Sequence, residues 1–256
     1  MHLNLHSKKI HYIEHGTQYK SNGTCLFLHG WGLSNRAFLP VVKKLQHRFH
    51  VVSLDLPGFG DSDMPIGFWG YEAYAQFVDQ FLNAIDVKKA HLIGQSTGGG
   101  IALATAACFP EKVLSLILVN STGIPMKKLP SIPKRVLEIA QQYWHSGFRR
   151  ENNVVIADMT RNAWRSISHL LSSVALPIKH DLRYLLGKVK VPTLFVWGKN
   201  DDMLPIEHAH EFQTHLPHAK LKVIDDGHHE WCFVYPELFA TMIENFYDNL
   251  HHPRHD

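Results

Sequence analysis

The sequence predicts an α/β fold: a mostly parallel central sheet flanked by helices, with one helical insertion. Short apolar runs rich in β-branched residues alternate with stretches whose apolar residues have helical spacing. This alternation stops at Gly123 and resumes after about Leu186, and the pattern between these points is helical. Because a helix between two strands returns the chain to the same end of the sheet, the alternation favours parallel pairing.

Each strand and helix is predicted from its own pattern. The predicted buried strands are Thr24–Leu28, Val51–Leu54, Ala90–Ile93, Leu116–Val119, Thr193–Trp197 and Leu221–Ile224. The clearest helical spacing lies in Tyr71–Ile85, Ile101–Phe109 and Glu207–Leu216. Residues 3–15 are predicted as two short strands around Ser7, Lys8 and Lys9, which form an antiparallel edge of the sheet.

The predicted domain organisation is a core of residues 1–122 and 187–256 with a helical cap inserted at 123–186. Prolines at positions 125, 130, 133 and 177 punctuate the cap. From Pro125 to Lys190 the chain carries 12 Lys and Arg against 4 Asp and Glu. Such an excess is typical of a solvated helical face, while a basic lid would suit a substrate with a carboxylate.

Length and composition limit the possible classes of protein. A chain of 256 residues, 45% hydrophobic and 19% charged, is sufficient for one large packed domain. The formal net charge is only +3 and the basic residues are scattered, so no nucleic-acid partner is indicated. Twenty dispersed histidines show no metal-ligand spacing. With neither a Walker nor a Rossmann motif present, no cofactor or metal is expected.

The cysteines and the apolar runs indicate a cytoplasmic location. The three cysteines, Cys25, Cys108 and Cys232, are sparse and lack CxxC spacing, which argues against disulfides or structural zinc. The N-terminus does not resemble a signal peptide, and no run approaches the ~18 apolar residues of a transmembrane helix. We therefore expect neither secretion by this route nor integral membrane association.

A candidate nucleophile lies in the segment Gly-Gln-Ser-Thr-Gly at residues 94–98, between a predicted strand and a helix of small residues. In a sharp strand-to-helix turn, the serine of G-x-S-x-G is held in a strained conformation with its oxygen exposed. Gly94 and Gly98 would relieve crowding around Ser96. The competing interpretation is an ordinary helix-capping serine, because serine is favoured at N-caps.

A serine hydroxyl is a weak nucleophile until a base removes its proton, so a histidine and a carboxylate are expected further along the chain. The strand at Thr193–Trp197 is followed by Asp201 and Asp202. The strand at Leu221–Ile224 is followed by His228 and His229. The order serine, acid, histidine fits a nucleophile elbow.

Five segments together resemble the α/β-hydrolase superfamily, in its capped serine esterase and C–C hydrolase branch. They are His-Gly-Trp-Gly at 29–32, Asp-Leu-Pro-Gly-Phe-Gly-Asp-Ser at 55–62, the turn at Ser96, the Trp-Gly-x-x-Asp-x-x-x-Pro segment at 197–205, and Gly-His-His at 227–229. The resemblance covers nearly the whole chain and implies an α/β-hydrolase fold.

The resemblance also implies roles for particular residues. Asp201 is the expected acid, because the family places it four positions after the site of Trp197. His229 is the expected base from its spacing to Asp201 and to the later proline, with His228 as the alternative. The backbone N–H groups of Trp31 and Thr97 are the expected oxyanion hole.

Other noticeable residues are given structural interpretations. His29 is expected to be buried and hydrogen-bonded near the oxyanion loop. Asp55 is expected to fix the loop that follows its strand, and Cys232 has no neighbour that promises a lowered thiol pKa. The Trp31 side chain is expected to form a wall of the acyl pocket.

The predicted function is hydrolysis of a small-molecule ester, or a related carbonyl substrate, through an acyl-enzyme on Ser96. Serine argues against dehalogenases and epoxide hydrolases, which resemble this frame but carry aspartate there. C–C bond hydrolysis of an anionic ring-cleavage product is the alternative, although those enzymes typically have Gly-Asn-Ser-Met-Gly-Gly at the turn. Perhydrolysis or acyl transfer ranks below these. A small-molecule receptor on a hydrolase scaffold is a further possibility from a different class.

Overall fold

The computed structural model describes residues 1–126 and 154–251. The strands are β1 (His2–Leu5), β2 (Lys8–His15), β3 (Thr24–Leu28), β4 (His50–Leu54), β5 (Ala90–Gln95), β6 (Val113–Val119), β7 (Thr193–Gly198) and β8 (Lys220–Ile224). The helices are α1 (Leu39–Leu45), α2 (Tyr71–Ala84), α3 (Thr97–Cys108), α5 (Val154–Ser173), α6 (Ala175–Lys179), α7 (Arg183–Leu186), α8 (Ile206–His215), α9 (Trp231–Val234) and α10 (Pro236–His251).

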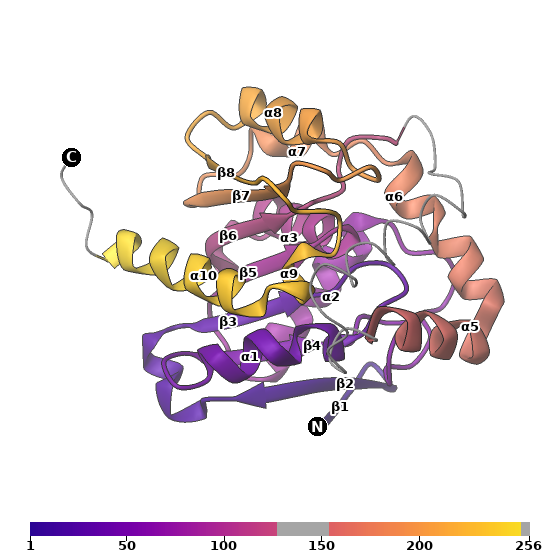
Figure 1. Ribbon diagram of the computed structural model, residues 1–256. Helices are drawn as coiled ribbons and strands as arrows, with labels where there is room; N and C mark the ends of the chain where they lie inside the picture. The colour runs from indigo at the N-terminus through magenta and orange to yellow at the C-terminus, as the bar shows by residue number, and fades with distance from the viewer. Residues whose placement is uncertain (127–153, 252–256) are drawn as a thin grey trace.

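The eight strands form one sheet in the order β1-β2-β4-β3-β5-β6-β7-β8 (Figure 1). All pairings from β4 to β8 are parallel, while β1 and β2 pair antiparallel at one edge. The predicted fold class and the predicted antiparallel edge are therefore confirmed. In a parallel arrangement the carboxyl ends of the strands lie at one end of the sheet, where binding sites of open α/β folds are found.

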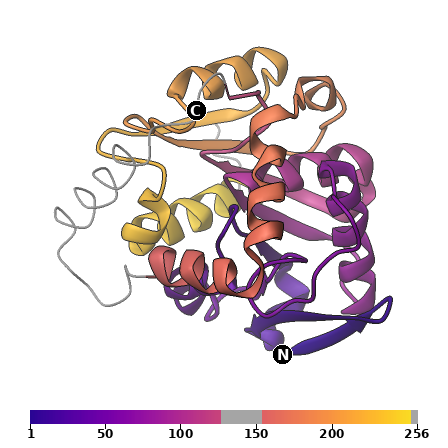
Figure 2. The same cartoon turned by 90° about the vertical axis from the view of Figure 1, so that its right-hand side faces the viewer.

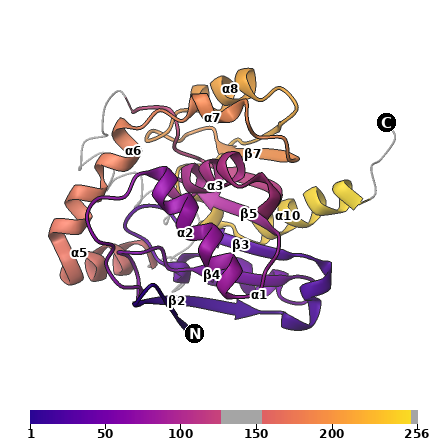
Figure 3. The ribbon, with the colours of Figure 1, turned by 180° about the vertical axis from the view of Figure 1, so that it is seen from behind.

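Alternate residues of each strand are buried on opposite faces of the sheet, because the side chains of a strand repeat every two residues. Leu26 and Leu28 of β3 pack with α2, α3 and α8 on one face, whereas Cys25 and Phe27 pack with α1 and α10 on the other. Figures 1 and 3 show these two helical layers from opposite sides. Because both faces are covered, the central strands are apolar throughout.

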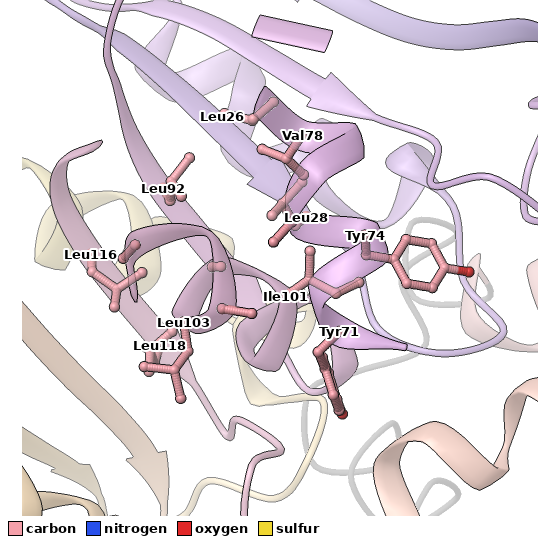
Figure 4. Packing of buried hydrophobic residues seen from close by; sticks show 14 of the residues in the cluster. Leu26, Leu28, Tyr71, Tyr74, Val78, Leu92, Ile101, Leu103, Leu116 and Leu118 are labelled. Atoms are coloured by element: carbon pink, nitrogen blue, oxygen red, sulfur yellow. The ribbon is translucent and has the colours of Figure 1, made fainter. Parts of the chain in front are cut away.

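Helix α3 lies very close to the sheet because three glycines follow Thr97 in its first turn. A Cβ on Gly98 would lie 2.1 Å from the carbonyl oxygen of Leu28, and one on Gly94 would lie 2.3 Å from that of Gly98. Farther along α3, Ile101 and Leu103 join the core formed by β3, β5, β6 and α2 (Figure 4). The small residues after Ser96 therefore fix the position of the turn that carries it.

Three local predictions differ from the structure. The first hairpin turns at His6 and Ser7, which have positive φ angles of 49° and 62°, so that Lys8 and Lys9 belong to β2. Helix α3 begins at Thr97 rather than Ile101, because close packing on the sheet outweighs the low helix propensity of glycine. Strand β8 is only half-buried, because it is the edge of the sheet.

Helices α5, α6 and α7 occupy the described part of the predicted cap, and residues 127–153 of the cap lie outside the described residues. Figure 2 shows α5 and α6 running across the end of the molecule. Helix α5 bends at Ser166, where φ is −163° and ψ is 94°. Within the described ranges, no helix is long and apolar enough to cross a membrane.

We expect Gly98→Ala to destabilise the protein by about 1–3 kcal/mol, because the added methyl group would overlap backbone oxygens that cannot move freely. Gly187→Ala is the matched control: Gly187 has helical angles of −62° and −16°, and a Cβ there meets no atom within 4 Å. The control should be neutral or stabilising by up to about 1 kcal/mol. Urea unfolding measures both free energies, and equal effects would contradict the close-packing argument.

Candidate active site

Ser96 lies in a strained turn at the carboxyl end of β5. Its φ of 53° and ψ of −120° are unfavourable for a residue with a side chain. The turn is held by backbone bonds: Ser96 N–H donates to the Val119 carbonyl at 3.0 Å, and the Ser96 carbonyl accepts from Thr122 N–H at 3.0 Å. The hydroxyl makes no capping bond to α3. Ser96 therefore stands at the N-cap position of α3 without capping the helix through its side chain.

Asp201 and His229 form a buried pair at the same end of the sheet. Asp201 follows β7, His229 follows β8, and His229 Nδ1 lies 2.8 Å from Asp201 Oδ2. The other carboxylate oxygen, Oδ1, accepts from the backbone N–H groups of Met203 at 2.8 Å and Leu204 at 2.9 Å. Asp201 is 3% exposed and His229 4%. With Nδ1 engaged, Nε2 is the imidazole nitrogen left for chemistry.

The pKa of Asp201 is lowered by its surroundings. Burial by itself raises this pKa, but the charge and hydrogen bond of His229 and the donors from Leu204 N–H and Asn120 outweigh burial. An ionised carboxylate only accepts hydrogen bonds, so the contact with Asp201 places a hydrogen on Nδ1 of His229. The pairing of His229 with Asp201 thus determines that Nδ1 is the ring nitrogen that donates to the carboxylate.

Asn120 is a site residue that the sequence analysis missed. Its Nδ2 donates to Asp201 Oδ2, while its Oδ1 accepts from Trp231 Nε1 at 2.8 Å and from Gly198 N–H at 3.3 Å. Asn120 directly follows β6 and has a φ of 41°, a conformation that asparagine tolerates better than most residues. A polar residue directly after an apolar strand is the only signal that the sequence offered.

The neighbouring alternatives occupy different positions. His228 is half-buried, and its Nδ1 is buried with no hydrogen-bond partner among the described residues. Asp202 is exposed. The structure thus brings His229 to Asp201, and the hydrogen bonds of the described residues include none between His228 and Asp201.

The loop at residues 30–34 lies against Ser96. A Cβ on Gly30 would be 3.1 Å from Ser96 Cβ and 2.4 Å from Gln95 Oε1. Gln95 Nε2 in turn donates to the His229 carbonyl at 3.2 Å, so Gln95 lies between the loop and the segment that carries the histidine. The described hydrogen bonds do not include one from Ser96 to His229, and such bonds commonly tighten only when substrate binds.

A cavity of about 210 Å³ opens beside Thr97 and Trp31. Most of its lining is apolar or aromatic, and its polar members are Thr97, His169, Ser172 and Ser173. No Lys, Arg, Asp or Glu occurs among the lining residues in the described part of the chain. Trp31 is one of the lining residues, and its Nε1 donates to Leu170 O at 3.2 Å and to Ser173 Oγ at 3.1 Å.

His29 and Cys232 have the structural roles expected of them. His29 is fully buried, with Nε2 accepting from Leu56 N–H at 3.0 Å and Nδ1 lying 2.8 Å from the Gly30 carbonyl. Burial lowers the pKa of His29 and keeps it neutral, despite nearby acidic groups. Burial raises the pKa of Cys232, so this thiol is not activated. The three cysteines are free.

Asp55 also fixes its loop as expected. Its Oδ1 accepts from Asn35 N–H at 2.6 Å, and its Oδ2 accepts from Asp61 N–H at 2.9 Å and lies 2.7 Å from His11 Nδ1. His11, Asp55 and Asp61 offer atoms close enough to share a metal ion. The Asp55 oxygens already accept these bonds, and Asp61 is paired with two arginines. Fold stabilisation explains this cluster.

The sheet order, the strained serine turn and the order serine, aspartate, histidine define an α/β-hydrolase fold. A family model for the alpha/beta hydrolase family matches residues 25–242. The chain belongs to this family and is an enzyme of the α/β-hydrolase class.

Named relatives are consistent with membership of the alpha/beta hydrolase family. The chain is 24% identical to monoacylglycerol lipase ABHD6 of Rattus norvegicus, with 98% of this chain and 85% of the relative covered. It is 28% identical to the pimeloyl-[acyl-carrier protein] methyl ester esterase of Aeromonas hydrophila, with 86% and 94% covered. Among solved structures, a bacterial membrane phospholipase A has a TM-score of 0.83 at 26% identity, covering 98% of this chain and 86% of that one.

Acid titration should reveal the contribution of Asp201 to stability. Its pKa is lower folded than unfolded, so the carboxylate stabilises the fold above the unfolded value of about 3.9. That contribution is lost as the pH falls through the lowered folded pKa. We expect Asp201→Asn to cost about 1–3 kcal/mol at pH 7, because it replaces a charged acceptor with a group that faces other donors.

The difference in unfolding free energy between wild type and Asp201→Asn should shrink below about pH 3.9. Chemical unfolding between pH 7 and the acid limit of folding measures it. Asp202→Asn is the neighbouring exposed control and should change stability by less than about 0.5 kcal/mol at each pH. A pH-independent difference for Asp201→Asn would show that its charge is unimportant to the fold.

Proposed function

We propose that this protein hydrolyses carboxylic esters of small or medium-sized molecules through an acyl-enzyme on Ser96. The observation that carries the proposal is the buried His229–Asp201 pair, which lies at the same end of the sheet as the strained Ser96 turn. Gln95 links the Ser96 turn to the segment that carries His229, because it directly precedes Ser96 and its side chain donates to the His229 carbonyl. These are the components of a serine triad.

In the proposed mechanism Ser96 Oγ attacks the ester carbonyl while His229 Nε2 takes its proton. The histidine then returns this proton to the departing alcohol, and Asp201 orients and stabilises the imidazolium. Water, activated by His229, attacks the acyl-enzyme and releases the acid. The strained Ser96 backbone directs the hydroxyl away from the helix that it precedes.

The proposed oxyanion hole consists of the backbone N–H groups of Thr97 and Trp31. Thr97 is the first residue of α3, and Trp31 follows Gly30, which packs against Ser96 Cβ. Both residues line the cavity. Donors fixed in place before the reaction stabilise the developing oxyanion, and each typically contributes about 10² to 10³ in rate.

We propose a neutral, largely apolar acyl group as the substrate part that fills the cavity. The described lining supports this assignment because it holds aromatic and aliphatic side chains and no ionic group. The names of the lipase and esterase relatives support ester chemistry. We further propose that residues 123–186 form a cap over this cavity, because α5 and α6 supply His169, Ser172, Ser173 and Leu176 to its wall.

C–C bond hydrolysis of an anionic ring-cleavage product is the less favoured chemistry. The basic excess of the predicted cap suggested an anionic substrate, but the three arginines in the described part of the cap are engaged elsewhere. Arg161 pairs with Asp61, Arg183 pairs with Asp181 and Glu211, and Arg165 donates to the Ser62 carbonyl. The solvated-face interpretation of the charge therefore has the stronger support.

A small-molecule receptor on this scaffold is the alternative from a different class. Such a receptor would bind its ligand without repeated turnover.

The nucleophile is tested with p-nitrophenyl esters of increasing acyl length. We expect wild type to turn over repeatedly, with a burst if deacylation is slow, and Ser96→Ala to lose at least about 10³-fold in kcat/KM. Ser168→Ala, an exposed serine of α5, is the matched control and should retain activity. Absence of turnover on every ester would move the assignment to C–C hydrolysis or a receptor.

The two adjacent histidines provide a second test. His229→Ala should lower kcat by about 10³-fold or more, because the general base is removed. His228→Ala should change kcat by less than about 10-fold, because a residue outside the triad contributes only through local packing. Steady-state kinetics on the preferred ester measures both. A larger loss in His228→Ala than in His229→Ala would contradict the assigned base.

A further inference from the structure

Helix α5 contacts the predicted oxyanion loop at several positions. Asp158 accepts from Ser34 Oγ at 2.6 Å, and the carbonyl of Leu170 accepts from Trp31 Nε1 at 3.2 Å. The Met159 sulfur lies so near Gly32 that a Cβ there would be 2.4 Å from it. Helix α5 thus contacts the 30–34 loop near both ends of the loop and in the middle of the loop.

Asn162 makes the central contacts between α5 and this loop. Its Nδ2 donates to the carbonyls of Gly32 at 2.8 Å and Leu33 at 3.1 Å. Its Oδ1 accepts from Gly60 N–H at 3.0 Å, in the loop that follows β4. Asn162 is only 3% exposed. One amide therefore joins the two loops that supply Trp31 and Phe59 to the cavity wall.

The three bonds also fix which way the amide faces. Two carbonyl oxygens require donors, and one N–H group requires an acceptor, so only one orientation of the asparagine satisfies them. An isosteric aspartate would place a carboxylate oxygen against both carbonyls. Replacement by alanine would leave two carbonyls and one N–H group of the loops without these partners, at a cost of about 1–3 kcal/mol for each buried group left unsatisfied.

We propose that Asn162 is a positioning residue, which holds the 30–34 loop so that the Trp31 N–H points at the developing oxyanion. This inference rests on the proposed ester hydrolysis and deepens it. Asn162 bonds the loop one and two residues after Trp31, whereas Leu33 N–H bonds back to the Gly30 carbonyl at 3.2 Å. Trp31 therefore lies within a short turn that Asn162 anchors on one side.

A donor fixed in advance contributes to the transition state more than to substrate binding. Loss of the Asn162 anchor should leave the cavity and the acid–base pair in place while the Trp31 N–H becomes poorly directed. The expected signature is a lower kcat at nearly constant KM. A general weakening of the cap would instead alter KM, because α5 and α6 also supply cavity wall.

The test compares Asn162→Ala and Asn162→Asp with Arg165→Ala, which removes another anchor of the same helix, the bond to the Ser62 carbonyl. Inhibition is measured with a trifluoromethyl ketone, which forms a tetrahedral adduct with the serine, and with the methyl ketone of the same acyl group. We expect both Asn162 variants to lose about 10- to 100-fold in kcat/KM and in trifluoromethyl ketone affinity. Methyl ketone affinity and KM should change by less than about 2-fold.

Arg165→Ala should keep kcat within about 3-fold of wild type, because it leaves the 30–34 loop bonded to Asn162. Equal weakening of both ketones, or equal kcat losses in Arg165→Ala and the Asn162 variants, would overturn the positioning role. All variants are assayed at a temperature where unfolding curves show them folded. Should Asn162→Asp not fold, Asn162→Ala carries the comparison.

Amide hydrogen exchange gives a readout that does not depend on turnover. Exchange of a peptide spanning residues 30–34 should be faster in Asn162→Ala than in wild type or Arg165→Ala, and unchanged exchange would overturn the anchor. If wild type hydrolyses esters and Ser96→Ala does not, while Asn162→Ala retains kcat, only this inference fails. If wild type hydrolyses no ester, the proposed function fails, and exchange still decides whether Asn162 orders the loop.

Discussion

The close approach of α3 to the sheet determines the geometry of this end of the molecule. Glycines at 98 and 94 allow backbone to meet backbone on both sides of the sharp turn at Ser96. The strain of that turn is compensated by two backbone hydrogen bonds of Ser96. One is to Val119, the last residue of the neighbouring strand β6, and the other is to Thr122, which follows that strand. The position of Ser96, the proposed nucleophile, is therefore fixed by the same packing that forms the core.

Parallel topology brings the remaining groups to that turn. Strands β5, β6, β7 and β8 are neighbours. The loops that carry Ser96, Asn120, Asp201 and His229 therefore lie next to one another at the carboxyl end of the sheet. A buried carboxylate in this position is costly unless it is paired and hydrogen-bonded. Asn120 contributes to this by donating to Asp201, and its own Oδ1 is held by Trp231 Nε1 and by Gly198 N–H.

The sequence predicted the core fold, because apolar runs and their spacing report directly on strands buried on both faces. The resemblance to the α/β-hydrolase superfamily singled out Asp201 and His229, and these two residues do meet, because the neighbouring strands β7 and β8 end side by side. Asn120 and Asn162 were not predicted. A single asparagine carries no periodic signal, and its importance depends on partners up to 130 residues away, such as Gly32. The start of α3 was misplaced for a related reason, because tertiary packing rather than propensity makes its glycines helical.

The orientation of α5 is set by directional bonds more than by burial of apolar surface. Its buried residues include Asp158, Asn162 and Ser173, whereas Trp164 is 92% exposed. Apolar packing tolerates small displacements, while buried polar groups lose bonds when they shift. Asp158 on this polar face is almost completely removed from water, and this burial raises its pKa. A helix attached in this manner has one favoured position relative to the loops that it contacts. That property suits the positioning role proposed for Asn162.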